Sequence, residues 1–275
     1  MPKLKDIIIT LDTGDFDMEL LGFNSHEIEL MMTAIHPDEP ADAEPQIDRA
    51  EELNKIWKVK TGDLWQIGEH RLLCGDSTKA EDVERVMGEE KADMVMADPP
   101  YGMSAVESSG VLSARYSKDI KGDKDNETAK RGFAACASIK APQVWWGANY
   151  YTEKMPSSGC WLVWDKNNGG SDQADAELAW TNLEGVVRIF KQASEKIDRV
   201  HPTQKHPLLI MWAIEKTSGT LVYDPFLGSG TTMVACQNLN RKCMGIEISP
   251  NYCSVVLERM KTAFPSIEIK KIEKE

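Results

Sequence analysis

The 275-residue chain predicts an α/β fold with a mostly parallel sheet and helices on both faces. Apolar runs of strand length occur at residues 91–96, 221–223 and 242–247. Helical patterns follow at residues 231–239 and 249–264. Short strands that alternate with helices are typical of a parallel sheet, in which ligands bind at the carboxyl ends of the strands.

The first of these strands leads into the tetrapeptide D-P-P-Y, Asp98-Pro99-Pro100-Tyr101. Asp98 supplies a charged acceptor, and the two prolines fix φ, so that their carbonyl groups point in set directions. Tyr101 offers a flat face for stacking. The group suits a planar base whose exocyclic amine bonds to Asp98 and to the Pro99 carbonyl while its ring lies on Tyr101. The alternative is a Pro-Pro turn with a solvated acid.

The second motif is the stretch 220–232, TLVYDPFLGSGTT, followed by the acid Glu247. It is a Gly-rich turn between a strand and a helix, and Glu247 lies 19 residues after Gly228. This layout holds a nucleoside-bearing cofactor and its ribose hydroxyls. Met233 stands where a dinucleotide fingerprint has its third glycine, and no lysine follows the turn as in a Walker A loop. A sulfonium nucleoside without phosphates fits better than either.

Together, D-P-P-Y and D-P-F-L-G-S-G-T-T resemble the amino-group (N6-adenine/N4-cytosine) DNA methyltransferases of the beta-type permutation, over residues 56–264. The resemblance implies a Rossmann-like fold of the S-adenosylmethionine (SAM)-dependent methyltransferases. It also implies methyl transfer from SAM to the exocyclic N6 of an adenine flipped out of double-stranded DNA. Cytosine N4 is the alternative, because D-P-P-Y accompanies adenine more often but not always. Trp164-Asp165-Lys166 is similar to a W-D-K of phage-type and prophage members.

Two further stretches are similar to cofactor contacts of this family. Asp76 and Ser77 stand where family members hold the adenine edge of SAM, and a simple helix cap is the alternative. Residues 201–207, HPTQKHP, are similar to an H-P-T-Q-K-P that lies beside the methionine moiety. Here His206 is inserted before Pro207. A helix N-terminus with a lysine suits the SAM carboxylate, and an ordinary helix cap is again the alternative.

The predicted site therefore has a catalytic part and a cofactor part. The catalytic residues are Asp98, Pro99, Pro100 and Tyr101. The cofactor-binding residues are Asp76, Ser77, Thr203, Gln204, Lys205, Asp224, Phe226, Gly228, Ser229, Gly230, Thr231, Thr232 and Glu247.

Charge and composition divide the chain into two parts. We expect residues 1–53 to be an acidic N-terminal extension and linker, because the first 50 residues hold 12 acids against three basic residues. Residues 54–275 are the expected methyltransferase domain, with a target-recognition insertion at about 103–200. The net charge of −12 predicts weak non-specific DNA affinity, because phosphate neutralisation supplies most of that affinity.

Composition also excludes several classes of protein. No apolar run is long enough for a membrane span, and the N-terminus is not a signal peptide. The six cysteines are scattered without a C-x-x-C pair, which indicates reduced thiols in a cytoplasmic protein, and the five histidines show no metal-ligand spacing. No proline precedes a cysteine, so the nucleophile of ring-carbon cytosine methylation is missing.

Two alternatives to a DNA methyltransferase stay open. One is an RNA or protein-glutamine methyltransferase, although those families usually carry Asn where Asp98 stands. The other is an inactive SAM-fold DNA-binding protein, which the two intact motifs disfavour. The partners considered are double-stranded DNA and a second copy of the chain in a homodimer.

Overall fold

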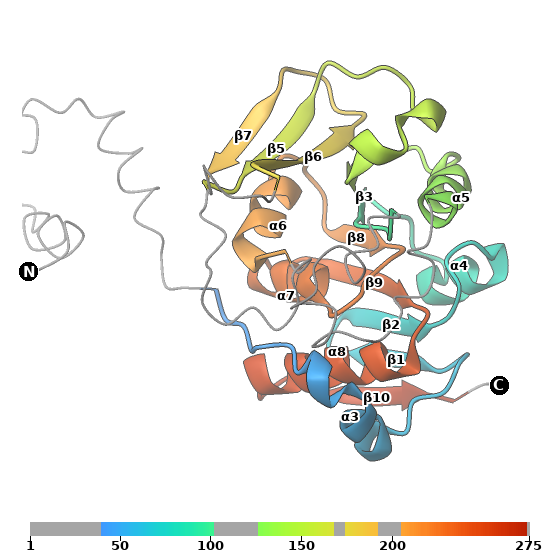
Figure 1. Cartoon of the computed structure of the whole chain (residues 1–275). Coiled ribbons are helices and arrows are strands. Elements are labelled where there is room, and N and C mark those ends of the chain that lie inside the picture. Colours follow the sequence, from blue (N-terminus) through green and yellow to red (C-terminus); the bar gives the residue numbers. More distant parts are fainter. Residues whose placement is uncertain (1–39, 102–125, 168–173, 192–204, 274–275) are drawn as a thin grey trace, which may run out of the picture. The chain divides into compact units, whose positions relative to one another are not determined.

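The computed structural model describes residues 40–101, 126–167, 174–191 and 205–273 (Figure 1). The chain divides into two compact units at Pro40, and all structural statements below concern the second unit, Ala41–Glu275. The part of the predicted extension before residue 40 lies outside the described residues, as do residues 102–125 of the predicted insertion.

Ten strands of the described part form one sheet in the order β10-β1-β2-β9-β8-β3-β4-β6-β5-β7. Their bounds are β1 Leu64–Ile67, β2 His70–Cys74, β3 Met94–Ala97, β4 Gln143–Trp146, β5 Trp161–Asp165, β6 Ala176–Thr181, β7 Arg188–Lys191, β8 Leu221–Asp224, β9 Lys242–Glu247 and β10 Ile269–Ile272. The central strands β2, β9, β8, β3 and β4 are parallel to one another, β1 and β6 run antiparallel to both of their neighbours, and β7 is parallel to β5. The predicted, mostly parallel sheet is confirmed, and its five central strands end at a common edge.

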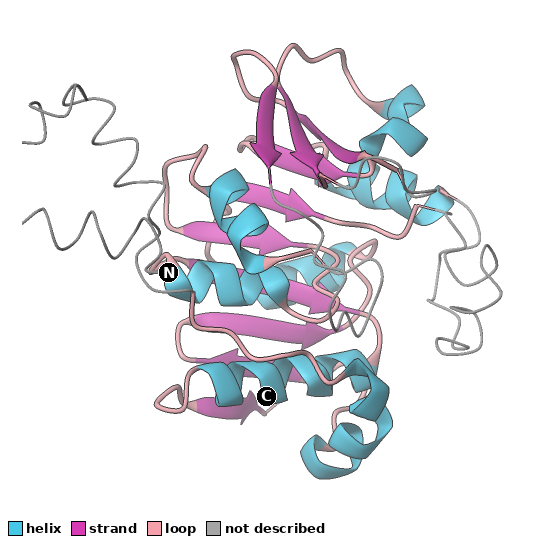
Figure 2. Cartoon of the chain, turned by 60° about the vertical axis from the view of Figure 1, so that its left-hand side comes forward, coloured by secondary structure: helices cyan, strands magenta, loops and turns pink. Residues whose placement is uncertain are grey.

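The helices cover both faces of this sheet, as predicted (Figure 2). They are α3 Ala50–Trp57, α4 Ala80–Met87, α5 Glu127–Cys136, α6 Pro207–Ile214, α7 Thr231–Asn238 and α8 Pro250–Ala263, with short 3-10 turns at Ile47–Arg49, Ala148–Tyr150 and Thr152–Lys154. Side chains of α6, α7 and α8 pack on one face, and those of α4 and α5 pack on the other. Strand β3 shows why: Met96 faces the first group, while Val95 faces the second, since successive side chains of a strand point to opposite faces.

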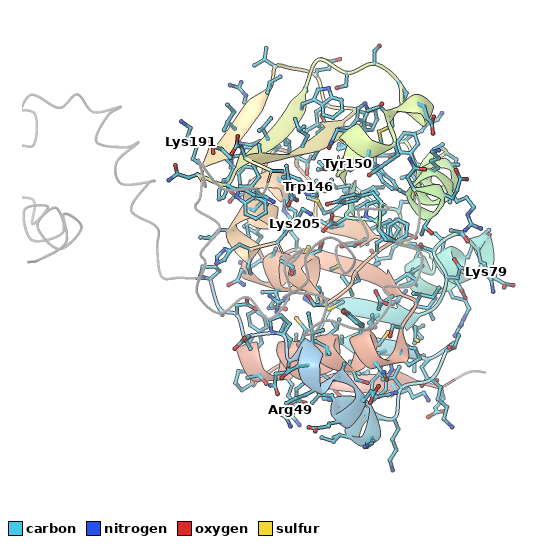
Figure 3. The ribbon with its side chains drawn as sticks, in the orientation of Figure 1. Arg49, Lys79, Trp146, Tyr150, Lys191 and Lys205 are labelled. Atoms are coloured by element: carbon cyan, nitrogen blue, oxygen red, sulfur yellow. The ribbon has the colours of Figure 1, made fainter. Side chains whose placement is uncertain are left out.

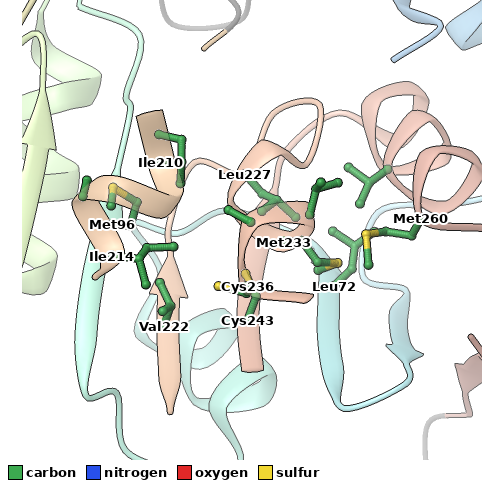
Figure 4. Close-up of a cluster of buried hydrophobic side chains, with 14 of the residues drawn as sticks. Leu72, Met96, Ile210, Ile214, Val222, Leu227, Met233, Cys236, Cys243 and Met260 are labelled. Carbon is green, nitrogen blue, oxygen red and sulfur yellow. The ribbon is translucent and has the colours of Figure 1, made fainter. Parts of the chain in front are cut away.

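The larger core lies between the sheet and α6, α7 and α8 (Figure 4). Met96 and Val222 of the strands belong to it together with Ile214 of α6, and each is at most 1% exposed. Burying such a side chain contributes about 1.5–3 kcal/mol. All six cysteines are buried, free thiols, in line with the predicted reduced state. The acids considered for the site lie outside this core, at the carboxyl ends of the strands. Within the described residues, no helix is long and apolar enough to cross a bilayer.

The N-terminal boundary of the compact unit differs from the one placed at residue 53. Helix α3 packs against α8 through Leu53 and Val255. Asp42 accepts two hydrogen bonds from the guanidinium of Arg259, both of 2.8 Å. Residues 41–53 therefore pack on the domain. Helix α3 is amphipathic: its acidic residues leave one face apolar, and that face is buried.

The region assigned to target recognition also contains part of the central sheet. Strand β4 pairs with β3, and α5 packs on the face opposite α7. Only β6, β5 and β7 extend the sheet beyond β4.

Candidate active site at the carboxyl edge of the sheet

Four acids lie along one edge of the sheet, because the parallel strands that precede them all end there. Asp98 follows β3, Asp224 ends β8 and Glu247 ends β9. Cys74 of β2 pairs with Glu247, which places Asp76 at the same edge. Neighbouring strands lie about 4.8 Å apart, so the ends of β3 and β9, with β8 between them, are about 10 Å apart. That distance suits two ligands that meet between Asp98 and Glu247.

The Gly-rich turn leaves β8 and enters α7 in a conformation that requires glycine. Gly228 and Gly230 have φ of 55° and 88°, in the left-handed region. A Cβ on Gly230 would lie 3.1 Å from Val256, so α8 packs closely against the turn. Asp224 is 2% exposed and accepts a 2.8 Å hydrogen bond from Phe226 N. Burial raises the pKa of the Asp224 carboxyl to about 7.

The ring of Phe226, which belongs to the turn, packs against α5. Its ring meets Trp145 edge-on at 6.4 Å, and a Cβ on Gly132 would lie 2.3 Å from the Phe226 ring. Ser229 is partly buried, and the side chains of Thr231 and Thr232 are 9% and 5% exposed. The turn is therefore fixed from both sides by packing.

Glu247 reaches from β9 to this turn, and its predicted contact with ribose hydroxyls stays a prediction. Its Oε2 accepts a hydrogen bond from Gly228 N at 3.0 Å, and its Oε1 accepts one from Ser249 N at 2.7 Å. Burial raises the pKa of the Glu247 carboxyl to about 7, although these two bonds lower it. Each carboxylate oxygen has a second lone pair, which can accept a ligand hydroxyl.

Arg259 of α8 binds the Gly-rich turn through its guanidinium. The sequence did not reveal this contact. The Arg259 side chain is 1% exposed. Its Nη1 donates to the Ser229 carbonyl and to Thr231 Oγ1, both at 3.1 Å, while Asp42 pairs with the other side of the guanidinium. The available signal was an arginine between Leu257 and Met260, on the apolar face of a predicted helix.

Asp76 and Ser77 form the turn before α4. Asp76 Oδ1 accepts hydrogen bonds from Thr78 N at 3.0 Å and from Thr78 Oγ1 at 2.7 Å, and Asp76 N donates to Asp82 Oδ2 at 2.9 Å. Ser77 is 5% exposed. These contacts are those of a turn that precedes a helix, and the contact with a cofactor's adenine edge stays a prediction.

Asp98 is paired with Lys205, which the sequence analysis placed with the cofactor instead. The Lys205 side chain is 3% exposed, and its Nζ lies 2.6 Å from Asp98 Oδ1 and 3.1 Å from Glu177 Oε2. It also lies 5.4 Å from the ring centroid of Trp146 (Figure 3). Burial lowers the pKa of Lys205, but Asp98 and Glu177 raise it further, so the net change is upward. Lys205 therefore stays a cation beside Asp98.

The inserted His206 caps α6. Its Nδ1 accepts a hydrogen bond from Leu208 N at 3.2 Å, and Pro207 occupies the first turn of the helix. Lys205 precedes this cap and is not part of it. Thr203 and Gln204 lie outside the described residues.

Tyr101 stacks on Tyr150, and their ring planes are nearly parallel. The centroids are 5.3 Å apart, with an interplanar angle of 4°. Gly147 has a φ of 65°, and a Cβ there would lie 2.3 Å from the Tyr101 ring. Burial raises the pKa of the Tyr101 phenol, which keeps it neutral. Trp145, Trp146 and Tyr151 are buried, whereas Tyr150 is 45% exposed.

Comparisons with known proteins give a family match and several relatives. The family described as DNA methylase (N6_N4_Mtase) matches residues 139–258, from before β4 into α8. The Type II methyltransferase M.HpaI of Haemophilus parainfluenzae is 24% identical over 246 residues, which cover 71% of this chain and 76% of that protein. These matches support the predicted family, the amino-group (N6/N4) DNA methyltransferases.

Other relatives of this DNA methyltransferase match shorter stretches. M.MjaII of Methanocaldococcus jannaschii is 24% identical over 178 residues, which cover 61% of this chain and 31% of that protein. M.SmaI of Serratia marcescens is 55% identical over 42 residues, 14% of its length. Among solved structures, the M1.HpyAVI–SAM complex has a TM-score of 0.45 at 24% identity, covering 68% of this chain and 98% of that one. The cytosine-N4-specific PvuII methyltransferase has a TM-score of 0.47 at 14% identity, covering 71% and 86%.

The predicted family is thus confirmed, and the phage-type likeness stays a prediction. The methyltransferase brings Asp98, Tyr101 and Lys205 together at the end of β3, and the turn residues together with Glu247. No cluster of three or more His, Cys, Asp or Glu residues suited to a metal occurs in the part of the chain that the structure describes.

Proposed function

We propose that this DNA methyltransferase transfers a methyl group from SAM to the exocyclic N6 of an adenine flipped out of double-stranded DNA. The observation that carries the proposal is the position of Asp98. Asp98 lies one strand away from Asp224 and the Gly-rich turn, and beside the stacked pair Tyr101 and Tyr150, of which Tyr150 is exposed. An acid and a stacking face for a base therefore adjoin a turn suited to a nucleoside.

The turn fits SAM in shape and in charge. A Cβ on Gly228 would meet only the Phe226 carbonyl oxygen, at 3.9 Å, so the turn is open on that side. Asp98, Asp224 and Glu247 complement a sulfonium cation. We assign the ribose hydroxyls to Glu247 and the adenine edge to Asp76 and Ser77.

The methionine end of SAM is assigned to Thr203 and Gln204, which precede the cap of α6. We assign Lys205 to Asp98 rather than to the SAM carboxylate. The reason is that its ammonium is buried and already lies against two carboxylates.

SAM supplies an electrophilic methyl group, and the chain's own residues prepare the nucleophile. The amine of adenine is a weak nucleophile, because its lone pair is delocalised into the ring. Lys205 holds Asp98 Oδ1, which leaves Oδ2 to accept one amine hydrogen, while the Pro99 carbonyl accepts the other. These bonds localise the lone pair and disperse the positive charge that would grow on nitrogen as the N–C bond forms and the S–CH₃ bond breaks, with the neutral thioether as the leaving group. The nitrogen then loses one proton to Asp98 or to water.

Cytosine N4 is the second candidate, since its amine is chemically alike. The proposal favours adenine for two reasons. D-P-P-Y accompanies adenine more often in the resembled family, and opening an A·T pair is less unfavourable than opening a G·C pair, where flipping requires a few kcal/mol.

The test is to incubate the protein with SAM and unmethylated genomic DNA, digest the DNA to nucleosides and identify the product by mass spectrometry. We expect N6-methyladenine, and none with the Asp98→Ala variant. N4-methylcytosine as the main product would overturn the choice of base. No methylated nucleoside from DNA would overturn the proposal.

A further inference from the structure

We propose that Glu177 and Lys166 are positioning residues for methyl transfer, which hold Lys205 and, through it, orient Asp98 toward the target amine. The inference rests on the proposed function. It gives a role to Lys166 of the W-D-K stretch and to Glu177, which no motif marks. Together with Lys205 and Asp98 they form a row of alternating charges, called here the charged row.

The distances show a continuous series of ion pairs. Lys166 Nζ lies 2.6 Å from Glu177 Oε1. Glu177 Oε2 lies 3.1 Å from Lys205 Nζ, which in turn lies 2.6 Å from Asp98 Oδ1. Two cations and two anions give the row no net charge, so no member is left as an uncompensated buried ion.

Burial separates the charged row from surface ion pairs. The side chains of Lys166, Glu177 and Lys205 are 12%, 18% and 3% exposed, while Asp98 at the open end is 35% exposed. Surface pairs are screened by solvent, whereas pairs this buried retain their orientation and their mutual effect. The open end is the one that would face a flipped base.

The sheet topology explains why residues far apart in the sequence meet here. Strand β6 runs antiparallel to both β4 and β5. The start of β6 and the end of β5 therefore lie at the edge where β3 and β4 end, and Trp164 pairs directly with Glu177. Lys166 follows β5 by one residue. The reversal of β6 thus delivers both residues to the edge that holds Asp98.

Each lysine of the row also lies over an indole ring. Lys205 Nζ is 5.4 Å from the ring centroid of Trp146, and Lys166 Nζ is 5.1 Å from that of Trp164. Both tryptophans are at most 2% exposed. A cation–π contact on one side and a carboxylate on the other restrict the movement of each ammonium. This accounts for the tryptophan of W-D-K as well as its lysine.

The charged row also determines how strongly Asp98 accepts a hydrogen. Burial raises the pKa of the Asp98 carboxyl, Lys205 lowers it, Glu177 raises it and Lys166 lowers it. Glu177 itself stays ionised, because Lys205 and Lys166 outweigh its burial and lower its pKa to about 2. Glu177 therefore shares the Lys205 ammonium and keeps Asp98 a stronger acceptor than Lys205 alone would allow.

Three other groups face Asp98 from neighbouring elements. The phenols of Tyr101 and Tyr151 stay neutral, since burial raises the pKa of each. Asp224 at the end of β8 is the third, and it interacts with Asp98 electrostatically. All three are unchanged in the variants below, so their effect is common to every profile.

The test is the pH dependence of the single-turnover methyl-transfer rate in Lys205→Met, Glu177→Gln and Lys166→Met. The rate falls at low pH as Asp98 is protonated. We expect the midpoint of that fall to move to higher pH in Lys205→Met, to lower pH in Glu177→Gln, and upward by less in Lys166→Met. The plateau rate of Glu177→Gln should decrease about tenfold or more, with unchanged KM values, because Asp98 becomes a weaker acceptor. Lys166→Arg should restore the wild-type midpoint.

Asp63 and Lys271 provide matched controls. They pair at 2.8 Å beside β1 and β10, at the opposite end of the sheet, with side chains 13% and 38% exposed. Asp63→Asn and Lys271→Met remove the same charge types and should leave the midpoint unchanged. Thermal unfolding and SAM titration of each variant show which of them are folded.

The outcomes separate this inference from the proposed function. An active wild-type enzyme with midpoints that do not move, or that move in one direction in all variants, overturns the role of the charged row. If Glu177→Gln does not fold, the Lys166→Met midpoint decides. A wild-type protein that methylates no DNA overturns the proposed function itself.

Discussion

Replacing Glu247 by glutamine tests the cofactor side of the site. In the structure both oxygens of Glu247 already accept backbone hydrogen bonds, from Gly228 at 3.0 Å and from Ser249 at 2.7 Å. Glutamine keeps one oxygen but turns an NH₂ donor toward the other N–H group. It therefore removes one charge-assisted acceptor for a ribose hydroxyl and weakens the support of the turn.

The expected loss follows from the strength of such bonds. A hydrogen bond to a charged group contributes about 1.5–3 kcal/mol, and each 1.4 kcal/mol changes an affinity tenfold. We therefore expect the Kd for SAM to rise about ten- to hundredfold in Glu247→Gln, measured by calorimetry. Asp63→Asn, on the far side of the sheet, should bind SAM as the wild type does.

The pH dependence of SAM affinity is a second test of the contact between Glu247 and the ribose. The pKa of the Glu247 carboxyl is about 7, and only its ionised form accepts both hydroxyls. Binding below that pH releases a proton, so the wild-type affinity should fall as the pH drops below about 7, by up to tenfold per unit for one group. The Glu247→Gln variant should lack this part of the fall. An unchanged Kd, or a wild-type pH profile retained in the variant, would refute the ribose assignment.

Three further predictions concern other parts of the molecule. Gly147→Ala should slow methyl transfer on the order of a hundredfold without weakening SAM binding, because its Cβ would displace Tyr101 from the base; an unaltered single-turnover rate would contradict this. Deleting residues 1–39 should leave SAM binding intact, whereas a deletion that also removes Asp42 should lower the free energy of unfolding by about 3–5 kcal/mol in urea titrations, because it leaves the buried Arg259 unpaired on that side; equal stability would show that this ion pair contributes nothing. Burial lowers the pKa of His70, so the unfolded chain binds more protons at this residue, and His70 by itself lowers the stability as the pH drops below about 6.5. The raised pKa values of Asp224 and Glu247 act in the opposite sense, so the measure is the difference in unfolding free energy between the wild type and His70→Gln. This difference should shift in favour of His70→Gln as the pH falls, and a difference that is independent of pH would contradict the assignment.

The parts of the fold that the sequence predicts are those with strong local patterns. Strands β3, β8 and β9 are short apolar runs, and helix α8 covers the helical pattern at residues 249–264, with Ser249 Oγ accepting a hydrogen bond from Tyr252 N at 3.5 Å. Parallel strands share an edge, so the sequence places Asp98 and Glu247 at the same edge of the sheet. That only β8 separates β3 from β9 comes from the structure.

The parts that the sequence does not predict depend on which elements become neighbours. Glu177 and Lys166 approach Asp98 only because β6 is reversed in the sheet, and no local pattern encodes that reversal. Tyr150 stands in a run of aromatic residues that are otherwise buried, so the sequence does not show that its side chain is exposed. Asp42 lies in an acidic stretch that gives no sign of its pairing with Arg259. Such contacts arise from tertiary packing rather than from propensity or periodicity.

The central claim is that Asp98 accepts a hydrogen from the amine that is methylated. It is tested most directly by comparing Asp98→Ala with the wild type in one preparation, in which single-turnover methyl transfer to DNA and SAM affinity are both measured. We expect transfer to be abolished while the Kd for SAM is nearly unchanged, because Asp98 lies at the end of β3 and the cofactor turn lies between β8 and α7. Transfer within tenfold of the wild-type rate would contradict it.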